Sequence, residues 1–192
     1  MTSRRLHQVA GHVVASGAAQ PALRVGAHRG AMSHAPENTL AAFEKAIAFG
    51  VYRIECDVRK TADVTTQTNP DYLNDFPRFF FLRDCLDWQG VLVLMHDATI
   101  DRTTDGKGTL RELTLAELGA VNAVTGAGGG VGSAPVPTLA AALRCAKGKC
   151  KLLVELKDED IASETVALIA AEGMTADCTI STFHEPSLRE CT

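Results

Sequence analysis

The sequence lacks several signals that mark specialised classes of protein. Its six cysteines form no CxxC pair and are too sparse in 192 residues for a disulfide framework. No apolar run approaches the roughly 20 residues that a transmembrane segment needs. Neither a GxxxxGK[ST] loop nor a GxGxxG that follows a strand is present. These absences argue against a disulfide-stabilised scaffold, an integral membrane protein and the common nucleotide-binding folds.

Charge of neither sign dominates, since 19 basic residues face 23 acidic ones and the net charge is −4. Such a balance provides no field to hold nucleic acid, so we expect no nucleic-acid partner. Sparse cysteines fit a reducing, cytoplasmic setting. The first acidic residue is Glu37, and the arginines before it weakly resemble an organellar transit segment. Because Arg24 and Arg29 adjoin the first predicted strand, we instead expect a disordered leader over residues 1–21.

Short apolar segments alternate with segments of helical spacing, which indicates an α/β protein with a parallel sheet. Asn38 is a candidate N-cap for the first helix, Thr114 and Glu117 have capping-box spacing, and residues 122–137 are predicted as loop.

The domain spans residues 22–192 with about five strands, short of the eight strands and roughly 250 residues of a closed (β/α) barrel. We therefore predict a TIM-type barrel that is incomplete at its C-terminus. Predicted strands cover 23–27, 51–58, 91–95, 151–157 and 178–183, and the later helices cover 139–146 and 161–171.

Residues 64–89 form a candidate insertion of unusual composition. Six of the ten aromatic residues of the chain lie there, and Pro70 and Pro77 interrupt any regular pattern. The apolar stretch 79–82 would be unfavourable on a solvated surface. We expect an irregular excursion that packs poorly or associates with a partner.

Three carboxylates lie near the ends of two predicted strands. Glu55 and Asp57 are two residues apart, so both side chains point to one face, and Glu155 and Lys157 repeat this spacing on a later strand. Like charges on one buried face need a compensating cation, and three carboxylates suit Mg²⁺ or Ca²⁺ better than zinc. The alternative is a set of ordinary solvated acids and ion pairs.

Two histidines each end an apolar strand, His28 after the first and His96 after the third. Placed beside the acids, they are candidates for a general acid and a general base. Arg29 and Lys157 supply positive charge for an anionic phosphoryl group. A single histidine at a strand end is more often an ordinary hydrogen-bonded residue, and we expect His34 and His184 to be structural.

These residues lie in motifs that resemble, in order, those of the glycerophosphodiester phosphodiesterases, relatives in fold of the phosphatidylinositol-specific phospholipases C. The motifs are His28-Arg29-Gly30, Pro36-Glu37-Asn38-Thr39, Ile54-Glu55-Cys56-Asp57-Val58, His96-Asp97, Asp101 to Gly108, and Glu155-Leu156-Lys157.

The resemblance implies a divalent metal on Glu55, Asp57 and Glu155, with His28 and His96 as the acid-base pair and Arg29 and Lys157 on the phosphate. It also implies a route: a glycerol hydroxyl of the substrate attacks phosphorus, the alcohol leaves, and water opens the cyclic phosphate to give glycerol 3-phosphate.

Two features depart from the family pattern. Removing 64–89 would restore the family's short turn, and the remaining barrel strands would follow Thr192. An open sheet edge or the aromatic insertion would favour self-association. Two alternatives therefore remain: a catalytically silent fragment or interaction module, and a related phosphodiesterase that acts on lysophospholipids.

Overall fold

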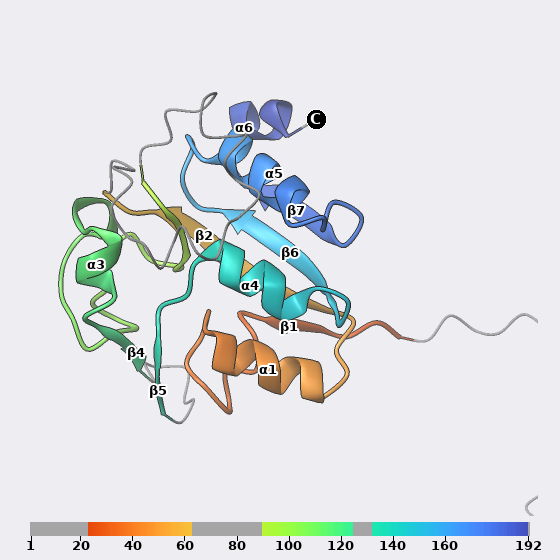
Figure 1. Ribbon diagram of the computed structural model, residues 1–192, viewed down its shortest axis with the longest axis horizontal. Helices are drawn as coiled ribbons and strands as arrows, with labels where there is room; N and C mark the ends of the chain where they lie inside the picture. Colours follow the sequence, from red (N-terminus) through yellow and green to blue (C-terminus); the bar gives the residue numbers. More distant parts are fainter. Residues whose placement is uncertain (1–22, 63–89, 125–131, 192) are drawn as a thin grey trace, which may run out of the picture.

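The computed structural model describes residues 23–62, 90–124 and 132–191, so the predicted leader and the predicted insertion lie outside the described residues. Four parallel strands lie in the order β1, β2, β6, β7, and β3 joins β2 to complete a sheet of five (Figure 1). The predicted α/β class is confirmed. The strands are β1 (Gly26–His28), β2 (Arg53–Lys60), β3 (Leu92–Leu94), β6 (Lys151–Leu156) and β7 (Cys178–Thr182).

Strand β3 is antiparallel to β2, so the prediction of a wholly parallel sheet is wrong at this position. β3 pairs with Val58–Lys60 of β2, beside β1, which pairs with Arg53–Glu55. Apolar residues with β propensity identify a strand but not its direction, which depends on how the chain turns before it. The antiparallel return carries the chain after β3 back along β2.

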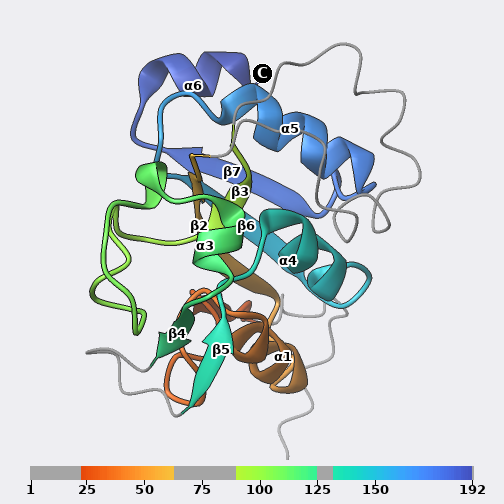
Figure 2. The ribbon, with the colours of Figure 1, turned by 60° about the vertical axis from the view of Figure 1, so that its left-hand side comes forward.

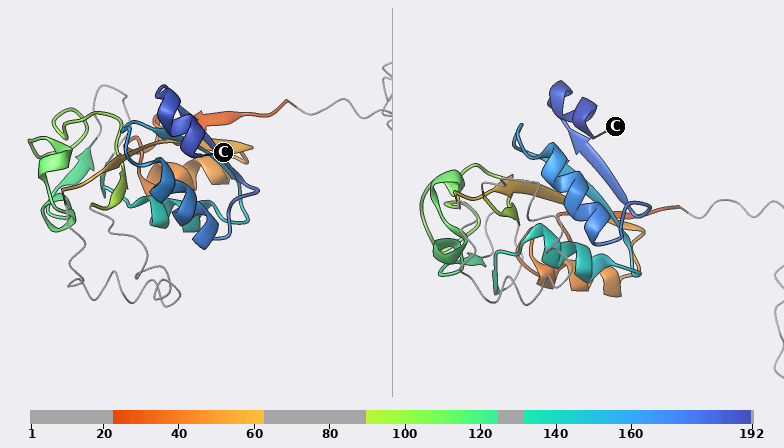
Figure 3. Two further views of the ribbon diagram at one scale, coloured as in Figure 1. Left: turned by 90° about the horizontal axis from the view of Figure 1, so that it is seen from above. Right: turned by 45° about the horizontal axis from the view of Figure 1, so that its top comes forward.

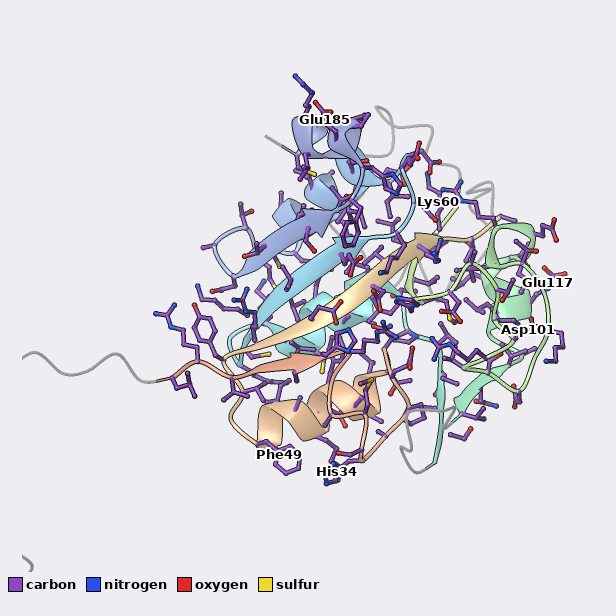
Figure 4. The ribbon with its side chains drawn as sticks, turned by 180° about the vertical axis from the view of Figure 1, so that it is seen from behind. His34, Phe49, Lys60, Asp101, Glu117 and Glu185 are labelled. Carbon is purple, nitrogen blue, oxygen red and sulfur yellow. The ribbon has the colours of Figure 1, made fainter. Side chains whose placement is uncertain are left out.

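Helices cover one face of the sheet. α4 (Leu139–Ala146) lies in front of β2 and β6 in Figure 1 and behind them in Figure 4, which views the molecule from the opposite side. α1 (Leu40–Ala48) and α5 (Ala162–Ala171) contribute to the same buried apolar cluster. Alternate residues of β2, namely Ile54, Cys56 and Val58, enter this cluster and are fully buried. Glu55 and Asp57 therefore belong to the opposite face.

The N-cap of α1 is Thr39, not Asn38 as predicted. The Thr39 hydroxyl accepts a hydrogen bond from the Ala42 amide at 3.2 Å, whereas the Asn38 side chain contacts β2. The sequence indicates the helix start to within one residue, but the hydroxyl of Thr39 and not the side chain of Asn38 provides the cap.

A smaller group of elements follows β3 and forms a second apolar cluster with it (Figure 2). Residues 122–137, predicted as loop, contain two short antiparallel strands, β4 (Asn122–Val124) and β5 (Ser133–Pro135). The predicted capping box is confirmed, since Thr114 and Glu117 exchange both hydrogen bonds. The remaining elements are η2 (Leu110–Glu112), α3 (Leu115–Leu118) and α6 (Glu185–Glu190), the last beside β7 (Figure 3).

The five cysteines in the described ranges are free thiols. None of the described helices is both long enough and apolar enough to span a bilayer.

Candidate active site

Three carboxylates converge on the face of the sheet opposite the helices. Glu55 and Asp57 project from β2, and Glu155 of β6 is the direct partner of Asp57 in the parallel ladder. One oxygen of each carboxylate lies within 4.8 Å of one oxygen of the other two. The structure therefore brings together the three acids that the sequence singled out, at a spacing that a single cation could bridge.

Two cations flank Asp57, whose side chain is fully buried. Arg29 Nε lies 3.0 Å from Asp57 Oδ2, and Lys157 Nζ lies 3.1 Å from Asp57 Oδ1. Lys157 also donates to Glu155 Oε1 at 2.6 Å. Burial alone would lower the pKa of Lys157, but the hydrogen bond to Glu155 and the charge of Asp57 outweigh it and raise that pKa. Lys157 is therefore held in its charged form between two acids.

Glu55 is the least compensated of the three acids. Its Oε2 accepts a hydrogen bond from the Arg29 amide at 2.9 Å, whereas its buried Oε1 has no hydrogen-bond partner. Burial, reinforced by the charge of Asp57, raises the pKa of Glu55 to about 7. A proton or a metal ion at Glu55 would relieve this imbalance.

Of the two predicted histidines, His28 lies beside an acid of this cluster, whereas His96 is linked to the cluster through the backbone of β3. His28 ends β1, where its Nε2 is 3.8 Å from Glu55 Oε2 and its side chain is 60% exposed. His96 follows β3, and its Nδ1 lies 2.6 Å from Asp97 Oδ1. The antiparallel direction of β3 brings His96 back to this end, since the preceding Met95 amide donates to the Asp57 carbonyl at 3.0 Å.

His34 and His184, which we expected to be structural, make contacts away from the acids, as does the exposed Lys107. His34 makes an edge contact with Phe49 at a centroid distance of 5.1 Å, and both residues lie on the rim beside α1 (Figure 4). His184 Nδ1 is 3.1 Å from Glu159 Oε1. Lys107 is 79% exposed and is 3.5 Å from Asp101.

Sequence reasoning missed the polar residues that hold the site together. Asn38 donates from Nδ2 to Asp57 Oδ2 at 2.9 Å, and Glu37 accepts hydrogen bonds from Arg29 and from Arg102. Asn38 has a positive φ of 57°, which asparagine tolerates better than most residues. The motifs that contain these residues were visible in the sequence, but their partners were not, because Glu37 and Arg102 are 65 positions apart.

Comparison with known proteins gives a consistent result. The family model described as "Glycerophosphoryl diester phosphodiesterase family" matches residues 28–66 and 89–186. A glycerophosphodiester phosphodiesterase of Caldanaerobacter subterraneus subsp. tengcongensis is 30% identical over 170 residues, which cover 85% of this chain and 59% of that protein.

Solved structures of phosphodiesterases are also similar to this chain. A glycerophosphodiester phosphodiesterase from Agrobacterium tumefaciens aligns with a TM-score of 0.65 and 31% identity over 88% of this chain and 61% of that one. An Oleispira antarctica phosphodiesterase, solved in complex with the product sn-glycerol-3-phosphate, aligns with a TM-score of 0.62 and 28% identity over 88% of this chain and 60% of that one. The chain thus spans about three fifths of the length of these three relatives. Their likeness supports the TIM-type fold.

Proposed function

Because the chain belongs to the glycerophosphoryl diester phosphodiesterase family, we propose that it carries the catalytic residues for hydrolysis of glycerophosphodiesters to glycerol 3-phosphate and an alcohol. The observation that carries the proposal is the convergence of Glu55, Asp57 and Glu155 beside His28. The product named for the Oleispira relative, sn-glycerol-3-phosphate, agrees with this chemistry.

Glu55, Asp57 and Glu155 fit a hard divalent cation, Mg²⁺ or Ca²⁺, which we propose as the cofactor. The oxygen-only donor set and the unpartnered Oε1 of Glu55 support this assignment. When bound, such an ion supplies a Lewis acid for the phosphoryl oxygens. Arg29 and Lys157, which flank Asp57, add positive charge for the same phosphoryl group.

The histidines supply proton transfer. In the first step one imidazole takes the proton of the attacking glycerol hydroxyl as the new P–O bond forms, and the other gives a proton to the departing alcohol as its P–O bond breaks. In the second step water attacks the cyclic phosphate, the P–O bond formed in the first step breaks to release the glycerol hydroxyl, and the two histidines exchange roles. Each histidine thereby returns to its starting protonation state.

The test is release of glycerol 3-phosphate from glycerophosphocholine by the purified chain, with added Mg²⁺ or Ca²⁺ and with chelator. We expect metal-dependent turnover that Glu55→Ala abolishes. Lys151→Gln is the control, because Lys151 begins β6 at the end of the strand away from Glu155. Turnover that is unchanged by chelator or retained by Glu55→Ala would rule out the proposed mechanism.

Absence of turnover together with broad, non-cooperative unfolding or obligatory association would favour the catalytically silent fragment or interaction module. A sharp monomeric unfolding transition would count against it. A substrate panel that includes lysophospholipids distinguishes a glycerophosphodiesterase from a related phosphodiesterase that acts on lysophospholipids. Preferential turnover of those lipids would replace the glycerophosphodiester assignment and leave the site unchanged.

A further inference from the structure

Arg102 joins two carboxylates in one bridge. Its Nε donates to Asp97 Oδ2 at 2.6 Å and its Nη2 donates to Asp97 Oδ1 at 3.0 Å. The adjoining edge of the guanidinium binds Glu37, with Nη2 to Oε1 at 2.8 Å and Nη1 to Oε2 at 3.1 Å. These contacts are bidentate on both acids, a geometry that the planar guanidinium provides and an ammonium group does not.

Asp97 in turn fixes His96. The hydrogen bonds from Arg102, together with the contact to His96, lower the pKa of Asp97 well below its usual range. An ionised carboxylate accepts hydrogen bonds only, so the 2.6 Å contact requires that His96 Nδ1 carries the proton. In the neutral ring the other nitrogen, Nε2, is then the free acceptor.

Glu37 connects the same bridge to the acids of β2. Glu37 Oε1 also accepts a hydrogen bond from Arg29 Nη1 at 2.9 Å, and Arg29 Nε lies 3.0 Å from Asp57 Oδ2. Arg102 belongs to the segment after β3, whereas Glu37 precedes α1. The bridge therefore ties the segment that holds His96 to the segment that holds Arg29.

We propose that Arg102 is a positioning residue, which fixes the ring orientation and tautomer of His96 through Asp97 and locks this histidine to the Arg29 segment through Glu37. This inference deepens the proposed function and rests on it only for its kinetic test. A direct role in binding the substrate phosphate is disfavoured, because four of the five guanidinium N–H groups are already engaged with Asp97 and Glu37.

The kinetic experiment compares Arg102→Lys and Arg102→Gln with the unaltered chain on glycerophosphocholine. We expect kcat to fall on the order of 10- to 100-fold in both variants while KM stays nearly unchanged, because the substrate contacts remain and the acid-base group is misplaced. Lysine keeps the positive charge but cannot make bidentate hydrogen bonds to both Asp97 and Glu37. Full activity in Arg102→Lys, or a raised KM with unchanged kcat, would overturn the proposal.

A second readout does not depend on turnover. Histidine side-chain ¹H–¹⁵N spectra, assigned with His96→Gln, report the tautomer of His96. We expect the Nδ1–H form in the unaltered chain and a mixture of tautomers in Arg102→Gln. The same tautomer in both proteins would refute the positioning role. If the unaltered chain releases no glycerol 3-phosphate but the tautomer shifts as described, the proposed function is wrong and the positioning of His96 by Arg102 is still supported.

Controls separate positioning from folding. Arg102 is 36% exposed, so its replacement leaves no large cavity, and thermal unfolding checks that each variant is folded. Lys151→Gln removes a cation at the far end of β6 and should change neither kcat nor the His96 tautomer. Glu37→Gln should give a smaller loss of kcat than Arg102→Gln, since Asp97 keeps its bidentate partner. A loss equal to or larger than that of Arg102→Gln would contradict the assigned order of contacts.

Discussion

Asn38 and Asp57 exchange two hydrogen bonds. Asn38 Nδ2 donates to Asp57 Oδ2 at 2.9 Å, and the Asp57 amide donates to Asn38 Oδ1 at 3.2 Å. The asparagine side chain thus bonds one carboxylate oxygen and the backbone amide of a fully buried acid, from a backbone with φ of 57°. The site depends on this pair before any substrate binds.

Asn38→Ala should lower the free energy of unfolding by about 2–4 kcal/mol, because it leaves buried polar groups of Asp57 unpaired and places alanine at a positive φ. Asn38→Gly removes the same hydrogen bonds without the backbone strain. We expect the glycine variant to be more stable than the alanine variant by about 1 kcal/mol. Urea unfolding measures both values, and equal stability of the two variants would contradict the strain argument.

Glu55→Gln should stabilise the metal-free chain at alkaline pH. The folded pKa of Glu55 is raised from 4.5 to about 7, so its ionisation costs stability progressively between these values and fully above pH 7. We expect a gain on the order of 2 kcal/mol at pH 8 and almost none at pH 4.5. Unfolding in the presence of chelator at both pH values tests this. A stability gain that is independent of pH would show that ionisation of Glu55 does not destabilise the folded chain.

Glu37 should contribute to stability in the opposite pH direction. Burial acts to raise the pKa of Glu37, but the hydrogen bonds and charges of Arg102 and Arg29 outweigh it and lower that pKa below 4.5. Its stabilisation is therefore present above pH 4.5 and is lost as pH falls through the lowered value. Glu37→Gln should cost about 1–3 kcal/mol at pH 7, and the difference from the unaltered chain should shrink as the pH falls below 4.5. A constant difference across that range would exclude the ion pairs as its source.

Deletion of residues 64–89 should preserve the fold and the site. The Thr61 amide donates to the Val91 carbonyl at 3.1 Å, so the two flanking segments already meet. Gly90 has a φ of 94° and suits a tight turn. Because each halving of a connection lowers the closure cost by about 0.6 kcal/mol, we expect stability to rise by up to about 2 kcal/mol. Thermal unfolding and turnover measure the result, and an unfolded deletion variant would contradict it.

The sequence predicts the acids of this site better than it predicts the connections between them. Glu55, Asp57 and Glu155 follow from strand alternation, a local rule that the ladder between β2 and β6 obeys. Arg102 and Glu37 meet through loop geometry, which no local rule encodes. The predicted parallel direction of β3 was wrong for the same reason. Its residues match a buried strand, while its orientation depends on the pairing of Thr61 with Val91, two residues that lie 30 positions apart.

The pairing of β2 with β3 has a final consequence for how this site can fail. His96 is placed by the ladder that joins Leu94 to Val58, and ladders shift in whole-residue steps that turn each side chain to the other face. An error there would remove His96 from the site altogether instead of displacing it slightly. Damage to the pairing of β2 with β3 would therefore divide the protein into molecules with His96 in place and molecules without it. The fraction of molecules with a complete site would fall, while each remaining site would keep its full turnover rate.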